Sequence, residues 1–130
     1  MRKIKFRAKA IYQDEWIYGH FCFASKAFGL PHDTPSIQQF NVDETQILCC
    51  RQIDPDTLGQ FTGLHDKNGK DIYFDDIVRN KYGDIGSVIW FSDWTLRVDW
   101  GGGDIHFIDP EWGLEVIGNI HDNPELLKTE

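Results

Sequence analysis

No stretch of the 130-residue sequence is apolar over the roughly 20 consecutive residues that a membrane-spanning helix needs. The N-terminal residues MRKIKFRAKA are basic but lack the apolar segment of a secretory signal peptide. We therefore expect no association with membranes and a cytoplasmic location.

Cysteine is scarce, and its spacing does not suggest a site. Cys22, Cys49 and Cys50 form no Cys-x-x-Cys or Cys-x-x-His pattern of the kind that binds structural zinc. Disulfides are rare in cytoplasmic proteins. We interpret the cysteines as small buried or half-buried side chains, and we expect neither a metal nor another cofactor.

Recognisable catalytic patterns are also missing. The five histidines are scattered without ligand spacing, and the sequence has no Gly-x-Ser-x-Gly motif. Glycines 101–103 precede Asp104 and a strand pattern, whereas a phosphate-binding loop leads into a helix with a lysine. Asp75 and Asp76 are adjacent, so on a strand their side chains point to opposite faces. These observations favour a protein that is not an enzyme.

Long helical patterns are absent, whereas aromatic residues (14%) and glycine (12 residues) are abundant. This composition favours a mainly β protein. We expect an N-terminal β part over residues 1–60. Residues 61–130 are expected to form a central hairpin, a small SH3-like β-barrel of short strands separated by turns, and a short terminal helical turn. Residues 24–36, with Gly29 and two prolines, are expected to form a loop.

The first predicted strand has one basic face. Apolar residues from Ile4 to Ala10 alternate with basic ones, the pattern of a half-buried strand. The basic residues are Lys3, Lys5, Arg7 and Lys9. Two interpretations stay open: a solvated face that discourages pairing between sheet edges, or a contact with an acidic surface of this or a neighbouring copy.

The net charge of −8 is unevenly distributed. Residues 1–70 hold nine Lys and Arg against eight Asp and Glu, whereas residues 71–130 hold four against thirteen. Affinity for nucleic acid comes largely from neutralising phosphates with Lys and Arg. The acidic second half therefore disfavours nucleic acid as the partner.

The sharpest local signal is a turn at Asp66, Asn68 and Gly69. Asn and Gly tolerate the positive φ that tight hairpin turns require, and the Asp66 carboxylate can accept hydrogen bonds from the turn. The sequence predicts either a type I turn closed by Gly69 or a two-residue type I′ turn.

Four tryptophans lie close together in the second half, at Trp90, Trp94, Trp100 and Trp112. A small barrel can bury only some of them. One interpretation places them in the core, and the other places some of them in a binding groove or subunit interface, where Trp is enriched.

Four blocks of the sequence resemble the YopX family of phage and prophage proteins: MRKIKFRAK, WIYGHF, IDPDTLGQFTGLHDKNGKDIYFDDIV and EVIGNIHDNPELL. They occur in the family's order and span nearly the whole chain. One departure is Asp75-Asp76, where the family usually has Glu-Gly-Asp, so a side chain stands where glycine would allow a positive φ. The resemblance implies a mainly β protein with an N-terminal part and a barrel-like C-terminal part, a tendency to self-associate, and no established activity.

These observations together predict a phage or prophage accessory protein in the host cytoplasm that acts as a non-catalytic interaction or assembly module. We expect a homo-oligomer, with a host or phage protein as a further partner. The alternative is a module that binds single-stranded nucleic acid through stacked aromatic side chains and a basic groove.

Overall fold

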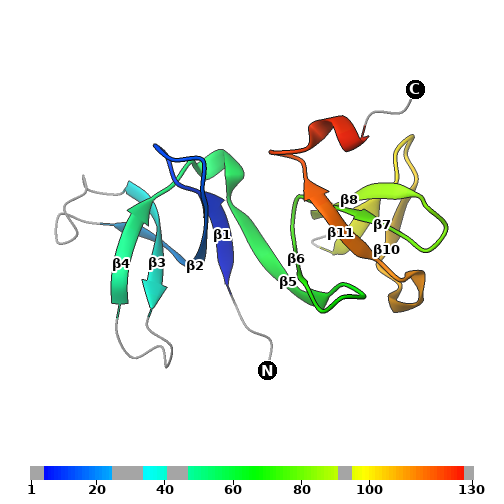
Figure 1. The fold of residues 1–130 in the computed structure, drawn as a ribbon, viewed down its shortest axis with the longest axis horizontal. Helices are drawn as coiled ribbons and strands as arrows, with labels where there is room; N and C mark the ends of the chain where they lie inside the picture. Colours follow the sequence, from blue (N-terminus) through cyan, green and yellow to red (C-terminus); the bar gives the residue numbers. More distant parts are fainter. Residues whose placement is uncertain (1–4, 25–33, 41–46, 91–94, 128–130) are drawn as a thin grey trace. The chain divides into compact units, whose positions relative to one another are not determined.

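The computed structural model describes residues 5–24, 34–40, 47–90 and 95–127. These residues form strands joined by short turns and 3-10 turns, so the prediction of a mainly β protein is confirmed. The chain divides into two compact units, residues 1–61 and 62–130, which follow one another from blue to red in Figure 1. It passes from the first unit to the second within β5, Gly59–His65.

The first unit contains an antiparallel sheet with the strand order β4-β3-β2-β1-β5. Its other strands are β1 (Phe6–Lys9), β2 (Trp16–Ala24), β3 (Thr34–Phe40) and β4 (Ile47–Gln52). A 3-10 turn, η2 (Pro55–Thr57), leads from β4 to β5. The side chain of Asp54 caps this turn by accepting a hydrogen bond from the Asp56 N–H at 3.1 Å.

The core of the first unit uses the apolar face of the alternating pattern in β1. Ala8 on β1 lies opposite Ile17 on β2, and both are buried. Ile37 on β3 and Ile53 after β4 complete the cluster together with Ala10. The apolar face of β1 is therefore buried at Ala8, but burial does not simply alternate, because Arg7 on the opposite face is buried as well.

The predicted loop over residues 24–36 is wrong at both ends, because Ala24 belongs to β2 and lies opposite Thr34. Thr34, Pro35 and Ser36 belong to β3, and Pro35 lies opposite Phe23 on β2. Proline is unusual inside a strand because it cannot donate a backbone hydrogen bond. Here its carbonyl still accepts a bond from the Ile53 N–H at 3.1 Å, so the strand continues through it. Residues 25–33 lie outside the described residues.

In the second unit, β6 (Asp71–Tyr73) pairs with β5, and the described residues beyond it form a five-stranded antiparallel sheet. Its order is β10-β9-β8-β7-β11. The strands are β7 (Asp76–Arg79), β8 (Ile85–Trp90), β9 (Leu96–Asp99), β10 (Ile105–Phe107) and β11 (Glu115–Asn119). Successive strands are neighbours except β11, which returns to lie beside β7 (Figure 1).

The predicted SH3-like barrel is not confirmed. Within the described residues the sheet stays open, because β10 and β11 lie at its two edges and do not pair. Two 3-10 turns accompany the sheet, η3 (Pro110–Trp112) and η4 (Pro124–Leu127), and η4 confirms the predicted terminal helical turn. None of the described helical segments is long and apolar enough to cross a membrane.

Three valines from neighbouring strands form the centre of the second core: Val78, Val88 and Val98. Val88 and Val98 lie directly opposite each other in the β8–β9 ladder. Ile72 and Phe74 from the β6–β7 region pack against them. The residues that alternate with the valines on β8 and β9 face the other side of the sheet.

The turn between β6 and β7 contains Asp75, which has a φ of +71°. Asp75 adopts this positive φ although it carries a side chain. Aspartate and asparagine visit this conformation more readily than other side chains. Two backbone bonds of 2.9 Å, from the Asp75 N–H to Val88 O and from the Ile120 N–H to Asp75 O, hold the turn in place.

Candidate functional site

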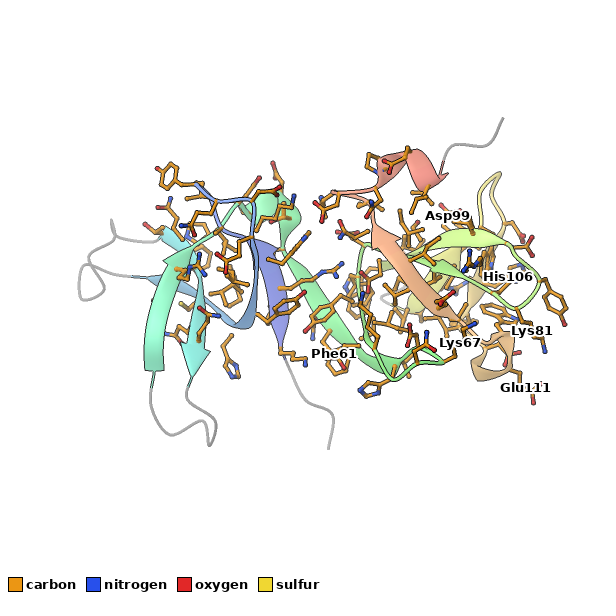
Figure 2. All side chains as sticks on the ribbon, viewed as in Figure 1. Phe61, Lys67, Lys81, Asp99, His106 and Glu111 are labelled. Carbon is orange, nitrogen blue, oxygen red and sulfur yellow. The ribbon has the colours of Figure 1, made fainter. Side chains whose placement is uncertain are left out.

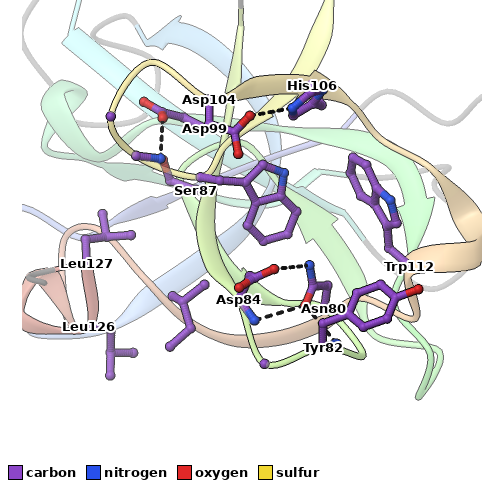
Figure 3. A pocket seen from close by; sticks show the side chains of 15 residues that line it. Asn80, Tyr82, Asp84, Ser87, Asp99, Asp104, His106, Trp112, Leu126 and Leu127 are labelled. Atoms are coloured by element: carbon purple, nitrogen blue, oxygen red, sulfur yellow. Dashed lines mark hydrogen bonds and ion pairs between the residues drawn. The ribbon is translucent and has the colours of Figure 1, made fainter.

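A pocket of about 930 Å³ opens on the second unit (Figure 3). Its walls come from the turn between β7 and β8, from the beginning of β8, from the glycine turn between β9 and β10, and from η3 and η4. Segments far apart in the sequence therefore share one concave surface. Ligand and side-chain binding sites typically have this form.

Three aromatic side chains line the pocket. Trp100 and Trp112 meet edge to face, with ring centroids 5.5 Å apart and an interplanar angle of 76°. Both are half-buried and pack against the core cluster that contains Val88 and Val98. Tyr82 also lines the pocket and is 74% exposed. The pocket thus has two rings supported by the core and a third in contact with solvent.

A short turn sets the position of Tyr82. The Asn80 Oδ1 atom accepts hydrogen bonds from the backbone N–H groups of Tyr82 and Asp84, both at 2.9 Å. Asparagine side chains often stabilise turns in this way. Gly83 has a φ of +89°, which a side chain would strain. The turn therefore presents Tyr82 and Asp84 together beside the pocket.

Three carboxylates line the same pocket, from Asp84, Asp99 and Asp104. The Asp99 Oδ1 atom accepts a hydrogen bond from the Gly101 N–H at 2.8 Å, and the Asp104 Oδ1 atom lies 2.5 Å from Nε2 of His106. A carboxylate offers about four lone-pair sites, so these contacts leave acceptor capacity. Among the described lining residues these three carboxylates stand beside one histidine, His106, and no lysine or arginine, so acidic side chains outnumber basic ones in the pocket.

The predicted hairpin lies between β5 and β6. Gly69 has a φ of +82°, and its N–H donates to Asp66 O at 3.0 Å. Asn68 does not have a positive φ, so the chain adopts the type I turn closed by Gly69 and not the type I′ turn. The Asp66 Oδ1 atom accepts hydrogen bonds from the N–H groups of Asn68 and Lys70, both at 2.9 Å.

The Asp66 carboxylate also reaches β11, where Oδ2 accepts a hydrogen bond from the Val116 N–H at 3.0 Å. Burial alone would raise the pKa of Asp66. The hydrogen bonds from the Val116, Lys70 and Asn68 N–H groups outweigh burial and hold this pKa below its usual value. The three residues that predict the turn, Asp66, Asn68 and Gly69, thus have a structural role.

Two basic residues around β1 contact aromatic rings of the first unit. The Lys5 Nζ atom lies 4.9 Å from the ring centroid of Phe61, which Figure 2 labels. The Arg7 Cζ atom lies 4.8 Å from the ring centroid of Trp16. Arg7 is only 6% exposed, so a solvated basic face does not describe this residue. These contacts have the geometry of cation–π interactions.

Lys9 completes the described part of the basic set. Its Nζ atom lies 5.6 Å from the ring centroid of Trp16 and 2.9 Å from the Asp14 Oδ1 atom. Lys3 lies outside the described residues. A partner that reaches this strand would meet Lys5 and Lys9, which are half-buried, more readily than Arg7.

Residues 5–128 match the protein-family model described as YopX protein. The chain belongs to the YopX family. The crystal structure of protein EF1440 from Enterococcus faecalis is similar to this YopX-family chain, with a TM-score of 0.54 and 24% sequence identity. The match covers 98% of this chain and 100% of that chain, and it shows a shared fold. No curated protein matches the chain.

The three described tryptophans among the four candidates of this YopX-family chain lie in two different places. Trp100 and Trp112 come together in the pocket. Trp90 does not line it; this side chain is 44% exposed and stacks on Phe74, with ring centroids 4.1 Å apart. Trp94 lies outside the described residues. Trp100 and Trp112 thus pack against the core, as the first interpretation expects, and also line a pocket; the role of these rings in binding or at a subunit interface stays a prediction.

The sequence patterns did not predict the polar side of the pocket, which includes Tyr82, Asp84, Asp99 and Asp104. A partial signal was present, because Asp99 alternates with the apolar Val98 and so had to face away from the core. The β8–β9 register places Asp99 opposite Ser87 on that outer face. The sequence does not reveal this register, so the convergence of the carboxylates could not be predicted.

The part of this YopX-family chain that the structure describes contains no group of three His, Cys, Asp or Glu side chains placed to hold a metal ion.

The Sγ atoms of Cys22 and Cys50 lie 3.6 Å apart. Burial, together with hydrogen bonding to Cys50, raises the pKa of the Cys22 thiol to about 11. Cys22 therefore stays protonated at neutral pH and is a poor nucleophile.

Proposed function

We propose that this YopX-family chain is a phage or prophage accessory protein that acts in the host cytoplasm as a non-catalytic interaction module. The pocket walled by Trp100 and Trp112 carries the proposal. Buried parts of protein interfaces are enriched in aromatic residues, and a few anchored ones supply most of the binding energy. An SH3-like shape of the second unit stays a prediction, on which the proposal does not depend.

The partner that we propose first is a second copy of the chain. Residues 71–130 hold four Lys and Arg against thirteen Asp and Glu, whereas the basic residues of β1 lie in the other half. Complementary charge on two copies favours their encounter and fixes their orientation. A host or phage protein with a basic surface would meet the same negative pocket.

Light scattering after size exclusion, at low and at high salt, tests self-association. We expect a defined oligomer of the 15.1 kDa chain at low salt and partial dissociation at high salt, because salt screens exposed charges. Trp112→Ala should weaken the oligomer, whereas Trp90→Ala, outside the pocket, should leave it intact. A monomer in both conditions would reject self-association. If Trp112→Ala and Trp90→Ala had the same oligomeric state, the contact between copies would not involve the pocket.

Binding of single-stranded nucleic acid is the second candidate. It is favoured by the cations beside Trp16, since single-strand sites combine basic and aromatic side chains. It is opposed by the carboxylates of the pocket, which would repel phosphates. We expect a single-stranded oligonucleotide at low salt to leave the tryptophan fluorescence unchanged. Saturable quenching would instead favour this candidate over the protein-interaction module.

A further inference from the structure

We propose that the pocket binds the guanidinium group of an arginine side chain, presented by a basic segment of a protein partner. The inference rests on the proposed function, because it names the chemistry that the interaction module recognises. The charge and the ring geometry of the pocket both favour an arginine over a nucleic acid or a neutral peptide.

The charge of the lining selects a cation. Asp84, Asp99 and Asp104 contribute carboxylates, whereas the described lining residues include one histidine, His106 beside Asp104, and no lysine or arginine. Figure 3 shows Asp84 on one side of the pocket and Asp99 and Asp104 on the other. A cation between them would interact with carboxylates from two directions. The same carboxylates would repel an anionic ligand.

The aromatic walls favour a cation that can also stack. Cations are attracted to the faces of Trp and Tyr rings within about 6 Å of the centroid. Trp100 and Trp112 are inclined at 76°, so their faces point in different directions around the pocket. Tyr82 already attracts the ammonium group of Lys81, whose Nζ atom lies 5.3 Å from the ring centroid.

The chain itself packs guanidinium groups on aromatic rings in both units. The Arg97 Cζ atom lies 4.1 Å from the ring centroid of Phe107, while its Nε donates to the Thr95 Oγ1 atom at 2.8 Å. Arg7 lies over Trp16 in the first unit. The Arg97 pair combines a ring contact with a hydrogen bond at the edge of the guanidinium group. The pocket offers the same combination to an external arginine.

Arginine fits this site better than lysine. The guanidinium group is planar and weakly hydrated, and it presents five N–H donors in its plane while its face stacks on a ring. Lysine ends in a compact, strongly hydrated ammonium group that cannot stack in this way. Carboxylates at the edge of a stacked guanidinium accept charge-assisted hydrogen bonds, which are about twice as strong as neutral ones.

The size of the pocket indicates that the arginine belongs to a longer segment. A volume of about 930 Å³ exceeds what one side chain fills. Figure 3 shows Leu126 and Leu127 on the side of the pocket away from Trp112. A residue next to the arginine could therefore place an apolar side chain on these leucines. We expect the recognised segment to combine an arginine with an apolar neighbour.

The test is a titration of the full-length, ¹⁵N-labelled chain with three peptides that differ at one position. The central residue is arginine, lysine or the neutral arginine analogue citrulline, followed by leucine in a Gly-Ser background. We expect the arginine peptide to shift the indole N–H signals of Trp100 and Trp112 and not that of Trp90. It should bind about tenfold more tightly than the citrulline peptide, with lysine in between.

Substitutions in the pocket provide the second arm of the test. Asp104→Asn removes a charge from a side chain that is 61% exposed, so we expect the variant to fold. Loss of one charge-assisted hydrogen bond should weaken the arginine peptide about tenfold. Asp71→Asn is the matched control, because Asp71 pairs with His65 and does not line the pocket. It should bind like the original chain.

Three outcomes would overturn the inference: equal binding of the citrulline peptide, equal affinity of the two aspartate variants, or no shift with any peptide. If a single-stranded oligonucleotide shifted the same indole signals, we would conclude that the pocket binds nucleic acid and not arginine. A defined oligomer without any peptide response would reject arginine but keep the interaction module. A monomer that responds to arginine would reject self-association alone.

Discussion

A hydrogen bond of 3.0 Å joins the carboxylate of Asp66 to the backbone N–H of Val116, although 50 residues separate them. The other carboxylate oxygen accepts bonds from the N–H groups of Asn68 and Lys70 in the hairpin turn. One side chain thus closes its own turn and attaches it to β11. Asp66 is only 8% exposed, so little water is available to replace these bonds.

Asp66→Asn should lower the free energy of unfolding by about 1–3 kcal/mol. The amide oxygen can still accept bonds within the turn, but the amide nitrogen would face the Val116 N–H, so that two donors meet. Urea denaturation measures the change. Glu125→Gln, on an exposed side chain, is the control and should be nearly neutral. Equal stability of Asp66→Asn and the original chain would contradict this role.

The same carboxylate should contribute to acid sensitivity. Its pKa is lower in the folded chain than in the unfolded one, so its stabilising contribution is present above the unfolded pKa of about 3.9 and is lost as the pH falls through the folded pKa. The difference in unfolding free energy between the original chain and Asp66→Asn should therefore shrink between about pH 6 and about pH 2. A difference that stays constant with pH would exclude this contribution.

Asp75 allows the energy of a positive φ to be measured directly. The Asp75 Oδ2 atom lies 3.3 Å from Nε2 of His121, and Asp75→Ala and Asp75→Gly both lose this contact. The difference in stability between the two variants therefore reports on the backbone conformation at residue 75. Because only glycine adopts this conformation without strain, the Gly variant should be more stable than the Ala variant by about 1 kcal/mol. Urea denaturation of the two variants checks this; an Ala variant of equal stability would mean that the turn relaxes.

Gly86 on β8 is expected to tolerate no side chain. A Cβ atom there would lie 2.7 Å from Asp99 O and 2.8 Å from atoms of Val98 and Trp100. Gly86→Ala should therefore destabilise the chain by about 1–3 kcal/mol and change the tryptophan emission, because Trp100 must move. Ser87→Ala, on the opposite face of the same strand, is the control. An unchanged emission spectrum in Gly86→Ala would contradict this packing.

The Cys22 thiol should react slowly with alkylating agents. With its pKa raised to about 11, it has far less thiolate at about pH 8 than an ordinary cysteine, and alkylation should be roughly tenfold slower or more. Mass spectrometry of the Cys22 peptide, from folded and from urea-unfolded protein, measures both rates. Cys50→Ser should accelerate the reaction only partly, because burial is the larger cause. Equal rates in folded and unfolded protein would rule out the raised pKa.

Local sequence patterns were sufficient for the parts of this protein that depend on near neighbours. Alternation predicted the first strand and the buried face that contains Ala8. Asp66 and Gly69 predicted the hairpin turn, because few residue types satisfy its backbone geometry. The four sequence blocks indicated the YopX family, which the match over residues 5–128 confirms.

These local patterns could not predict the contacts between segments that are distant in the sequence. The continuation of β3 through Pro35 depends on Ile53, and the open order of the second sheet depends on β11 returning to β7. The pocket required the register that sets Asp99 opposite Ser87 and the packing that brings Trp112 to Trp100. Register and packing arise from the folding of the whole chain, since each strand pattern is compatible with several partners.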